Sequence, residues 1–551
     1  MLRPLTAHAR RAVRAPRRPF LAAAAAVAAA LARAPGTALA AGPSVRTAQR
    51  PTGALTESAL AEMEAYVAGA LERFGVPGAS VAVVQGGALR FARGFGVTEL
   101  GGGGRPVGPD TRFIIGSVPK SMTALLVATL VDEGRLGWDT PVVEALPQFT
   151  LADPAATAAV TFRDLLSMRS GLPRFDGPLF FRPLTPEEVV ESLREVPLSA
   201  PPGEVFGYTN QGYATAGFAA AAAAGATYGR DLYPTYARLM QERLYDPAGM
   251  TRTALDFDAG AADPDRAGPH AVDLLLGRRT AVPLGLERGG FSVIPAGGTT
   301  WASAGDLARY VLLHLGRGVA PGGRRLVSEA GLLETRKPHT PMGGGTHFGL
   351  GWVVGEYRDQ EHLTYGGGNL GYTSYVALLP ALDLGVAVLT NASLAAPFTH
   401  AVADHVFEAA LGLEHTADAG HLTDEQEIGA LLAQLGGGLR PRPEPGEVAA
   451  LLGRYGPEPG VEVRAGGAGA LFLGTAFGDF PLYPVAGQAG AFLVGIGPGV
   501  TATFAPGERG AGAASLTIGW LLGDPQPPLI MARTGDSAPE RALAPQEEGR
   551  P

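Results

Sequence analysis

The spacing of apolar residues changes several times along the chain, and each change marks a different kind of element. Directly after Ala79, the sequence SVAVVQGGALRFARGFG alternates around a Gly-Gly pair, which predicts a β-hairpin. Beyond Ser117 the spacing becomes helical as far as Gly134, with repeated positions at Met122, Leu125, Leu126, Thr129 and Leu130. Proline fits the first turn of a helix, so Pro119 predicts that this helix begins at or just after Ser117.

Helical patterns and proline-bounded loops fill the middle of the chain, from about Pro141 to Met250. Strand patterns return near Phe348 as FGLGWVVGE, TSYVALLP and LGVAVLTN, the last two joined by the short turn ALD. A further helix is expected over Ala396–Leu411. Strands on both sides of a helical region predict an α+β fold, with one antiparallel sheet built from both ends, flanking helices and a helical insertion.

The C-terminal part of the chain differs in composition. Residues 414–447 are polar and proline-rich, which favours a linker with room for one helix. Residues 448–534 carry short apolar runs between glycines, such as ALFLG and AFLVGIG, and predict a small all-β domain. Residues 535–551 have the composition of a disordered tail. The main domain then covers residues 55–413, after a linker over residues 41–54.

The first forty residues have the layout of a signal peptide. They contain arginines and no acidic residue, then the apolar run FLAAAAAVAAALA and finally ALA at Ala38–Ala40. The stretch PRRPFLA resembles a twin-arginine export signal. The apolar run is short for a bilayer, so a retained anchor is the less favoured alternative. We therefore expect residues 1–40 to be cleaved and the product to be periplasmic or extracellular, without stable membrane insertion.

Charge and composition further restrict the class of protein and its expected partners. With 46% hydrophobic and 17% charged residues, 551 residues suffice for a large core in two domains, and the absence of cysteine excludes disulfides. The formal net charge is −8, and removal of seven leader arginines makes the mature chain more acidic still. An acidic chain without a basic stripe is not expected to bind nucleic acid.

Lysine is rare in this chain, because Lys and Arg total 44 and only Lys120 and Lys337 are lysines. Arginine stays protonated at working pH, whereas a buried lysine can lose its proton and act as a base. Lys120 follows Ser117 by three residues on the expected helix, so the amine and the hydroxyl can share one face. The alternative is an N-cap serine followed by a solvated lysine.

Two further stretches favour a catalytic role for Ser117 and Lys120. GYTNQGYATAG contains Tyr208 and Asn210, and LTYGGGNLGYTSYVALLP follows much later in the chain. In this order the three motifs resemble those of serine hydrolases of the β-lactamase and penicillin-binding protein superfamily, on the class C side. The resemblance covers about residues 55–412 and includes the stretches LLSMRSGLP, PPGEVFGYTN, YDPAGM, PAGGTTWASAGDLARY and FGLGW. It implies the same fold class as the pattern of strands and helices.

The resemblance also implies roles for individual residues. Ser117 would be the nucleophile, and Lys120 and Tyr208 would share its proton. Asn210 would hold Lys120 and a substrate amide or carbonyl. Further substrate contacts would come from Tyr365 and Gly367, and the oxyanion hole from the backbone N–H groups of Ser117 and Gly368.

Two positions depart from the pattern of these hydrolases. At the first position of the third motif they often carry Lys or His, and this chain has Tyr365, which offers no cation to a substrate carboxylate. In LLSMRSGLP, Met168 stands where the resembled enzymes usually have His, which indicates altered packing behind the site. The first departure favours neutral esters or amides over anionic substrates.

The expected function is therefore an exported serine hydrolase that forms an acyl-enzyme with a small-molecule ester, amide or β-lactam. Alternatives are a class C-type β-lactamase or D-alanyl carboxypeptidase, and a non-catalytic penicillin-recognising binding protein. No G-x-S-x-G or H-E-x-x-H occurs, and the glycines of GGGNLG precede a strand pattern rather than a helix. We expect no cofactor and no metal. The oligomeric state stays open, with a monomer favoured.

Overall fold

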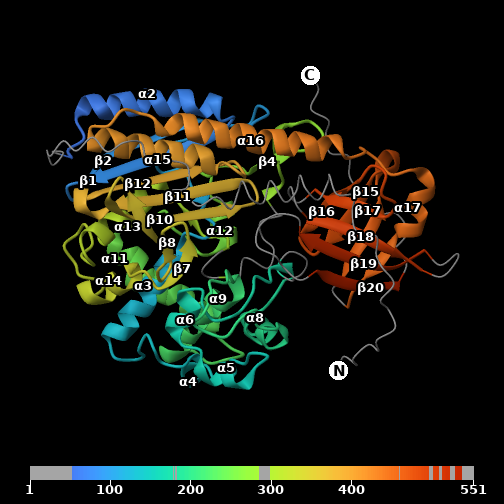
Figure 1. Ribbon diagram of the computed structural model, residues 1–551, viewed down its shortest axis with the longest axis horizontal. Coiled ribbons are helices and arrows are strands. Elements are labelled where there is room, and N and C mark those ends of the chain that lie inside the picture. Colours follow the sequence, from blue (N-terminus) through green and yellow to red (C-terminus); the bar gives the residue numbers. More distant parts are fainter. Residues whose placement is uncertain are drawn as a thin grey trace.

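An antiparallel sheet of eight strands forms the centre of the main domain (Figure 1). The computed structural model describes residues 53–535, except 178, 180–182, 285–293, 295–297, 458–459, 496–499, 508–511 and 521–527. The expected signal peptide and most of the tail lie outside these residues. In spatial order the strands are β2 (Ala88–Gly96), β1 (Gly78–Gln85), β12 (Leu384–Thr390), β11 (Tyr372–Leu379), β10 (Gln360–Asn369), β9 (Val353–Tyr357), β8 (Thr346–Phe348) and β7 (Thr340–Gly343).

The sheet joins the two ends of the main domain, as the sequence predicted. Strand β1 pairs with β12, so that Val81 lies opposite Val388. Gly86 and Gly87 both have positive φ angles, and they form the tight turn of the predicted β1–β2 hairpin. The α+β fold class is confirmed.

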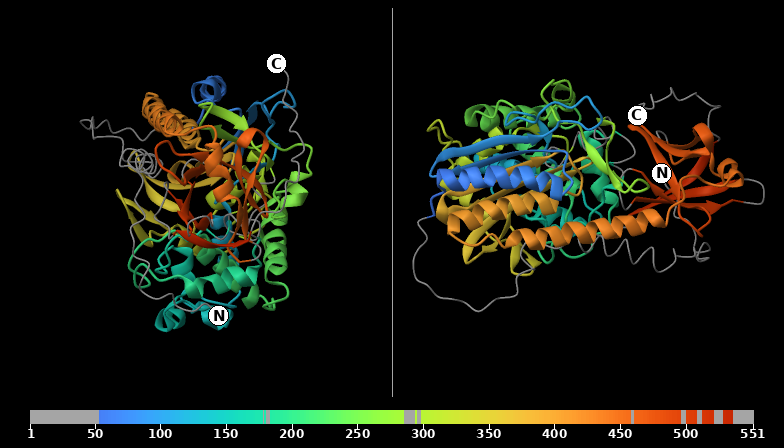
Figure 2. Two further views of the ribbon diagram at one scale, coloured as in Figure 1. Left: turned by 90° about the vertical axis from the view of Figure 1, so that its right-hand side faces the viewer. Right: turned by 90° about the horizontal axis from the view of Figure 1, so that it is seen from above.

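Helices cover both faces of this sheet (Figures 1 and 2). Helices α2 (Glu57–Arg73) and α15 (Ala396–Leu411) pack on one face, and α13 (Ala304–Leu315) packs on the other. Every residue of β1, β11 and β12 is buried as a result. Apolar residues therefore run almost continuously along these strands, because neither face meets water.

The predicted helical insertion lies against the second face of the sheet and shares its core with α3 (Pro119–Asp132). Its helices are α4 (Val142–Ala145), α5 (Pro154–Ala159), α6 (Phe162–Leu166), α8 (Pro186–Ser192), α9 (Asn210–Ala223), α10 (Leu232–Met240), α11 (Asp246–Ala248) and α12 (Phe257–Ala261). The remaining elements nearby are α14 (Glu329–Arg336) and two small two-stranded sheets, β3 (Phe113–Ile114) with β6 (Trp301–Ala302) and β4 (His270–Asp273) with β5 (Arg278–Ala281). Helix α3 begins two residues after Ser117, as Pro119 predicted.

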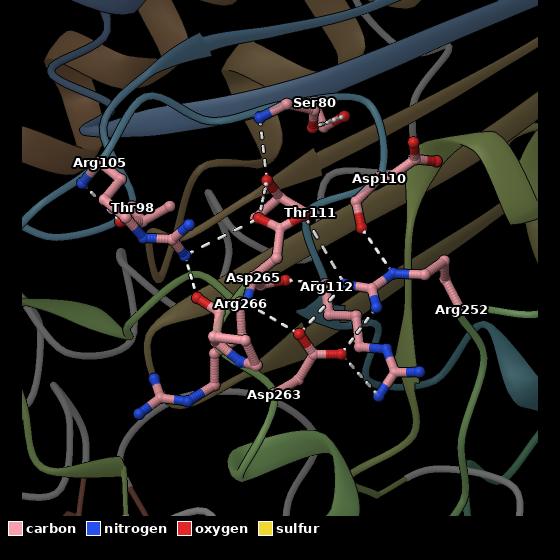
Figure 3. Close-up of polar contacts among 12 residues, drawn as sticks. Ser80, Thr98, Arg105, Asp110, Thr111, Arg112, Arg252, Asp263, Asp265 and Arg266 are labelled. Carbon is pink, nitrogen blue, oxygen red and sulfur yellow. Dashed lines mark hydrogen bonds and ion pairs between the residues drawn. The ribbon is translucent and has the colours of Figure 1, made fainter.

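A polar network anchors the strand that leads to Ser117 (Figure 3). The carboxylate of Asp263 pairs with Arg112 at 3.1 Å and with Arg252 at 2.7 Å. Asp263 and Arg112 are mostly buried, and the two guanidinium groups hold the pKa of this carboxyl below its usual range against the effect of burial. Because Arg112 directly precedes β3, the network fixes the start of the segment that carries the serine.

The C-terminal domain is a closed barrel of eight antiparallel strands, which confirms the predicted all-β domain. Its strands are β13 (Gly453–Tyr455), β14 (Val461–Ala465), β15 (Leu471–Thr475), β16 (Gly478–Pro484), β17 (Ala491–Val494), β18 (Val500–Pro506), β19 (Ala513–Trp520) and β20 (Leu529–Gly535). Apolar side chains fill the barrel core, among them Tyr455, Phe480, Phe492 and Phe504. Closure leaves the strands without a free edge.

A long helix connects the two domains where the sequence suggested a linker. Helix α16 (Ala417–Gly437) packs beside α15 and runs toward the barrel, which α17 (Pro445–Leu451) adjoins (Figures 1 and 2). An apolar cluster joins α16 to both domains and contains Leu274, Ile428, Leu432, Leu435, Leu439, Val485 and Leu493. In addition, Leu370 of the β10–β11 turn packs against the barrel core. The barrel is therefore seated on the rim of the main domain.

Leu435 belongs to this apolar cluster and is fully buried. We expect Leu435→Ala to weaken the attachment of the barrel by about 2–5 kcal/mol, the usual cost of such a cavity. Differential scanning calorimetry should then show the barrel unfolding apart from the main domain. Gln434→Ala, at the exposed neighbouring position, is the control and should leave the profile unchanged. A Leu435→Ala profile identical to that of the unmodified protein would contradict this role.

Candidate active site

Ser117 lies in the turn between β3 and α3, and its side chain is half-buried. The N-cap position of α3 is Val118, and no side chain caps this helix. The Ser117 hydroxyl instead lies 3.0 Å from the Nζ of Lys120 and 2.8 Å from the phenol oxygen of Tyr208. The alternative of an N-cap serine with a solvated lysine is therefore wrong.

Lys120 is fully buried, directly behind Ser117. Its Nζ donates to the Ser117 hydroxyl and, at 2.8 Å, to the Oδ1 of Asn210. Asn210 is the first residue of α9, and Thr209 caps that helix by accepting a hydrogen bond from the Gly212 N–H. The helix start thus fixes the asparagine that holds the lysine.

Tyr208 immediately precedes this cap, and its phenol oxygen contacts the same serine. The Nζ of Lys120 lies 5.0 Å from the centre of the Tyr208 ring. Met168 holds the backbone on both sides of Tyr208, because its carbonyl accepts a hydrogen bond from the Gly207 N–H and its sulfur accepts one from the Thr209 N–H. Met168 is buried with a φ of 56°, so the departure from the usual His lies in the packing behind the site, as expected.

The pKa values of Lys120 and Tyr208 both lie below their ordinary values. Burial is the main cause for Lys120, because a low-polarity environment disfavours the ammonium, although Tyr208 and Asp176 oppose this. For Tyr208 burial acts the other way, but the positive charges of Lys120 and Arg174 outweigh it and favour the phenolate. Both shifts favour the forms of Lys120 and Tyr208 that can accept the proton of the Ser117 hydroxyl.

Glycines bring the edge of β10 up to the Ser117 turn. A Cβ added to Gly367 would lie 2.0 Å from the Ile115 carbonyl oxygen, and one added to Gly116 would lie 2.8 Å from the backbone nitrogen of Gly368. Strand β9 pairs with β10 only from Gln360 to Thr364, so the β9-side edge is open beyond that point. The backbone of Gly368 therefore lies close to Gly116, the residue directly before Ser117, and the oxyanion hole formed by the N–H groups of Ser117 and Gly368 stays a prediction.

Tyr365 and Asn210 are more enclosed than residues that contact a substrate usually are. Tyr365 is 4% exposed, and its ring packs edge-on against Phe348 at 5.8 Å between centroids. Its hydroxyl has no hydrogen-bond partner of good geometry in the described part of the chain, and burial together with nearby Tyr208 raises its pKa well above the usual value. Asn210 is 3% exposed. The structure thus places both side chains behind the reacting groups.

Three residues of the site escaped the sequence analysis. Asp176 accepts hydrogen bonds from the Nδ2 of Asn210 at 2.9 Å and from the Nε of Arg174 at 2.6 Å. The third is Gly116, whose φ of 53° and contact with β10 both require glycine. The spacing of Arg174 and Asp176 in a proline-rich loop does not distinguish them from residues of any exposed loop. Gly116, directly before the serine, could have been predicted from its position.

The family comparison agrees with this geometry. Residues 63–411 match the family model described as Beta-lactamase, which is more than half of the chain. The chain therefore belongs to the Beta-lactamase family. This membership confirms the resemblance and supports the prediction of a serine hydrolase.

Several individual proteins are similar to the chain. The unguisins hydrolase ungD' of Aspergillus campestris (strain IBT 28561) is 30% identical over 337 residues, which cover 59% of each chain. The match thus spans about three fifths of that relative's length. Penicillin-binding protein 4 of Amycolatopsis lactamdurans is 30% identical over 347 residues, covering 59% of this chain and 83% of the relative.

Among solved structures, the octameric penicillin-binding protein homologue from Pyrococcus abyssi matches with a TM-score of 0.55 and 24% identity. The match covers 84% of this chain and 96% of that one, a larger share than the main domain alone. At this identity the likeness concerns the fold.

Gly116 offers a direct test of the approach between β10 and the serine turn. In Gly116→Ala the new methyl group would meet the Gly368 backbone, so we expect kcat/KM to fall by about a hundredfold, the usual effect of losing one oxyanion donor. Gly134→Ala is the matched control, because Gly134 also has a positive φ but an added Cβ meets nothing within 4 Å. Equal activity losses in the two variants would show that backbone strain alone is responsible.

Proposed function

We propose that the chain is an exported serine hydrolase that acts on an ester or amide through a covalent acyl-enzyme at Ser117. The observation that carries the proposal is the contact of one half-buried hydroxyl with two bases, Lys120 at 3.0 Å and Tyr208 at 2.8 Å. A nucleophilic serine requires such a proton acceptor within hydrogen-bond reach. Family membership supports the same chemistry.

Acylation begins when the Ser117 oxygen attacks the substrate carbonyl carbon and its proton passes to the Tyr208–Lys120 pair. The N–H groups of Ser117 and Gly368 stabilise the negative charge on the carbonyl oxygen. The tetrahedral intermediate then collapses, and the leaving alcohol or amine takes the proton from the pair. A water molecule then attacks the acyl carbon and gives one proton to the pair. When the second tetrahedral intermediate collapses, the pair returns this proton to the Ser117 oxygen, so that the carboxylic acid leaves and the free serine is restored.

The third motif favours neutral substrates in this proposal. Tyr365 provides a neutral phenol where a cation would contact a carboxylate, and its burial leaves little of it open to any ligand. A class C-type β-lactamase or D-alanyl carboxypeptidase is the alternative, supported by the match along most of the Amycolatopsis penicillin-binding protein. A binding protein without turnover would not need both Lys120 and Tyr208 in contact with the serine.

Export is proposed from the leader sequence. Residues 1–40 have the layout of a signal peptide and lie outside the described residues. Between residues 53 and 535, the described helices include none that is long and apolar enough to cross a bilayer.

Replacement of the nucleophile is the first test. We expect Ser117→Ala to lower ester hydrolysis by at least about a thousandfold, because the covalent step is lost. Its stability should stay within about 1 kcal/mol of the unmodified protein, since the serine caps no helix. Initial rates and chemical denaturation measure the two effects. Turnover that survives in this variant would rule out Ser117 as the nucleophile.

Lys120→Arg tests whether the lysine acts as a base. Arginine keeps the positive charge but cannot release a proton, so we expect a loss almost as large as that in Lys120→Ala. Stopped-flow measurement of acylation with an activated ester gives the rate directly. If Lys120→Arg keeps most of its activity, the lysine supplies only a fixed charge.

Substrate preference tests the role of the third motif. We expect short neutral esters to be hydrolysed with a higher kcat/KM than penicillins or D-alanyl peptides. One missing charge-assisted hydrogen bond corresponds to about a tenfold to hundredfold difference. Because the Tyr365 phenol is buried behind the reacting groups, Tyr365→Phe should leave this ranking unchanged. Efficient penicillin turnover by the unmodified protein would show that another group binds the carboxylate.

A further inference from the structure

An ion pair lies directly behind the reacting groups, in the loop between α6 and α8. The Nε of Arg174 donates to the Oδ2 of Asp176 at 2.6 Å. The Asp176 carboxylate is fully buried and also accepts from Asn210, which in turn holds Lys120. The guanidinium carbon of Arg174 lies 5.1 Å from the centre of the Tyr208 ring. One pair thus reaches both proposed bases.

We propose that Arg174 and Asp176 are positioning residues that set the protonation of the Lys120–Tyr208 pair from opposite sides. Asp176 acts on Lys120 through Asn210, and Arg174 acts on Tyr208 through the face of its ring. The inference rests on the proposed function, because it concerns the activation of Ser117.

The contribution of Asp176 follows from the two ends of the Asn210 amide. An ionised carboxylate only accepts hydrogen bonds, so Asp176 must face the NH₂ group of Asn210. The amide oxygen then faces Lys120 and accepts from its Nζ. Asp176 therefore determines which end of the amide meets the lysine, and its negative charge favours the ammonium form.

The contribution of Arg174 follows from its place above Tyr208. A guanidinium near an aromatic face is attracted to the ring, and it favours negative charge on the phenol oxygen. Arginine does not release its proton, so its charge is constant across the working pH range. The ion pair with buried Asp176 keeps the guanidinium in this position, although its side chain is 30% exposed.

Other groups also face the two bases. Among the described residues of α3, α9, β10 and the α6–α8 loop, the titratable or charged groups that act on Tyr208 and Lys120 are Tyr213, Tyr365, Arg174 and Asp176. Burial raises the pKa of Tyr213 and of Tyr365 well above the ordinary value, so both phenols stay neutral. Arg174 and Asp176 therefore supply the fixed charges of opposite sign beside the bases.

The two residues should have opposite effects on the pH profile. Activity needs the form of the pair that has lost a proton, so kcat/KM rises with pH through the pKa of the free enzyme. Loss of the Arg174 charge raises that pKa and moves the rise to higher pH. Loss of the Asp176 charge lowers the pKa of Lys120 and moves the rise to lower pH.

The experiment measures kcat/KM against pH for the mature protein with a neutral p-nitrophenyl ester. Its variants are Arg174→Gln, Asp176→Asn and Arg174→Lys, which restores the charge. Arg169→Gln is the matched control, because Arg169 is 25% exposed, pairs with Asp164 at 2.8 Å and is not among the main causes of the pKa shifts of Lys120 and Tyr208. Ser117→Ala tests the proposed function in the same assay, and circular dichroism checks the fold of each variant.

We expect the pKa in the kcat/KM profile to rise in Arg174→Gln and to fall in Asp176→Asn. It should return to the value of the unmodified protein in Arg174→Lys and stay unchanged in Arg169→Gln. A shift of one pH unit lowers the rate on the rising limb about tenfold in Arg174→Gln. Shifts in the same direction, or no shift in a folded Arg174→Gln, would overturn the inference even if Asp176→Asn failed to fold. If Ser117→Ala stays active, the proposed function fails instead.

Discussion

The burial of one amine is the constraint on which this site depends. Removing an ammonium from water costs several kcal/mol unless partners replace its hydration, and Lys120 is fully buried. The structure meets this cost with the Ser117 hydroxyl, the Asn210 oxygen and the faces of two aromatic rings, Tyr208 and Tyr213. The same burial lowers the pKa of the lysine. Stability and chemistry at this position are therefore linked.

The need for partners around the buried Lys120 amine explains why segments that are far apart in the sequence contact α3. Helix α9 supplies Asn210 from its first turn, and the loop before it supplies Tyr208. Strand β10 closes the site from the sheet side, where Gly116 and Gly367 allow contact between backbones that a Cβ would prevent. The polar network around Asp263 holds the strand before the serine. Leu370, in the turn after β10, packs against the barrel core. The barrel therefore adjoins the strand that carries the third motif.

Much of this arrangement could be predicted from the sequence, because local patterns encode it. The β-hairpin, the start of α3, the helix at Ala396–Leu411 and the all-β domain each follow from apolar spacing and turn residues. Asp176 and Arg174 could not be found in this way. Their role depends on a loop folding back onto α9, and their spacing is shared with any exposed turn. The enclosure of Tyr365 also depends on tertiary packing, here with Phe348, which motifs do not specify.

The central claim is that Ser117 is the nucleophile that Lys120 and Tyr208 activate. Intact-protein mass spectrometry after treatment with a fluorophosphonate, followed by peptide mapping, tests it most directly. The account predicts a single covalent adduct, located on Ser117, together with loss of ester hydrolysis in proportion to labelling. An adduct at another residue, or full inactivation without modification of Ser117, would contradict it.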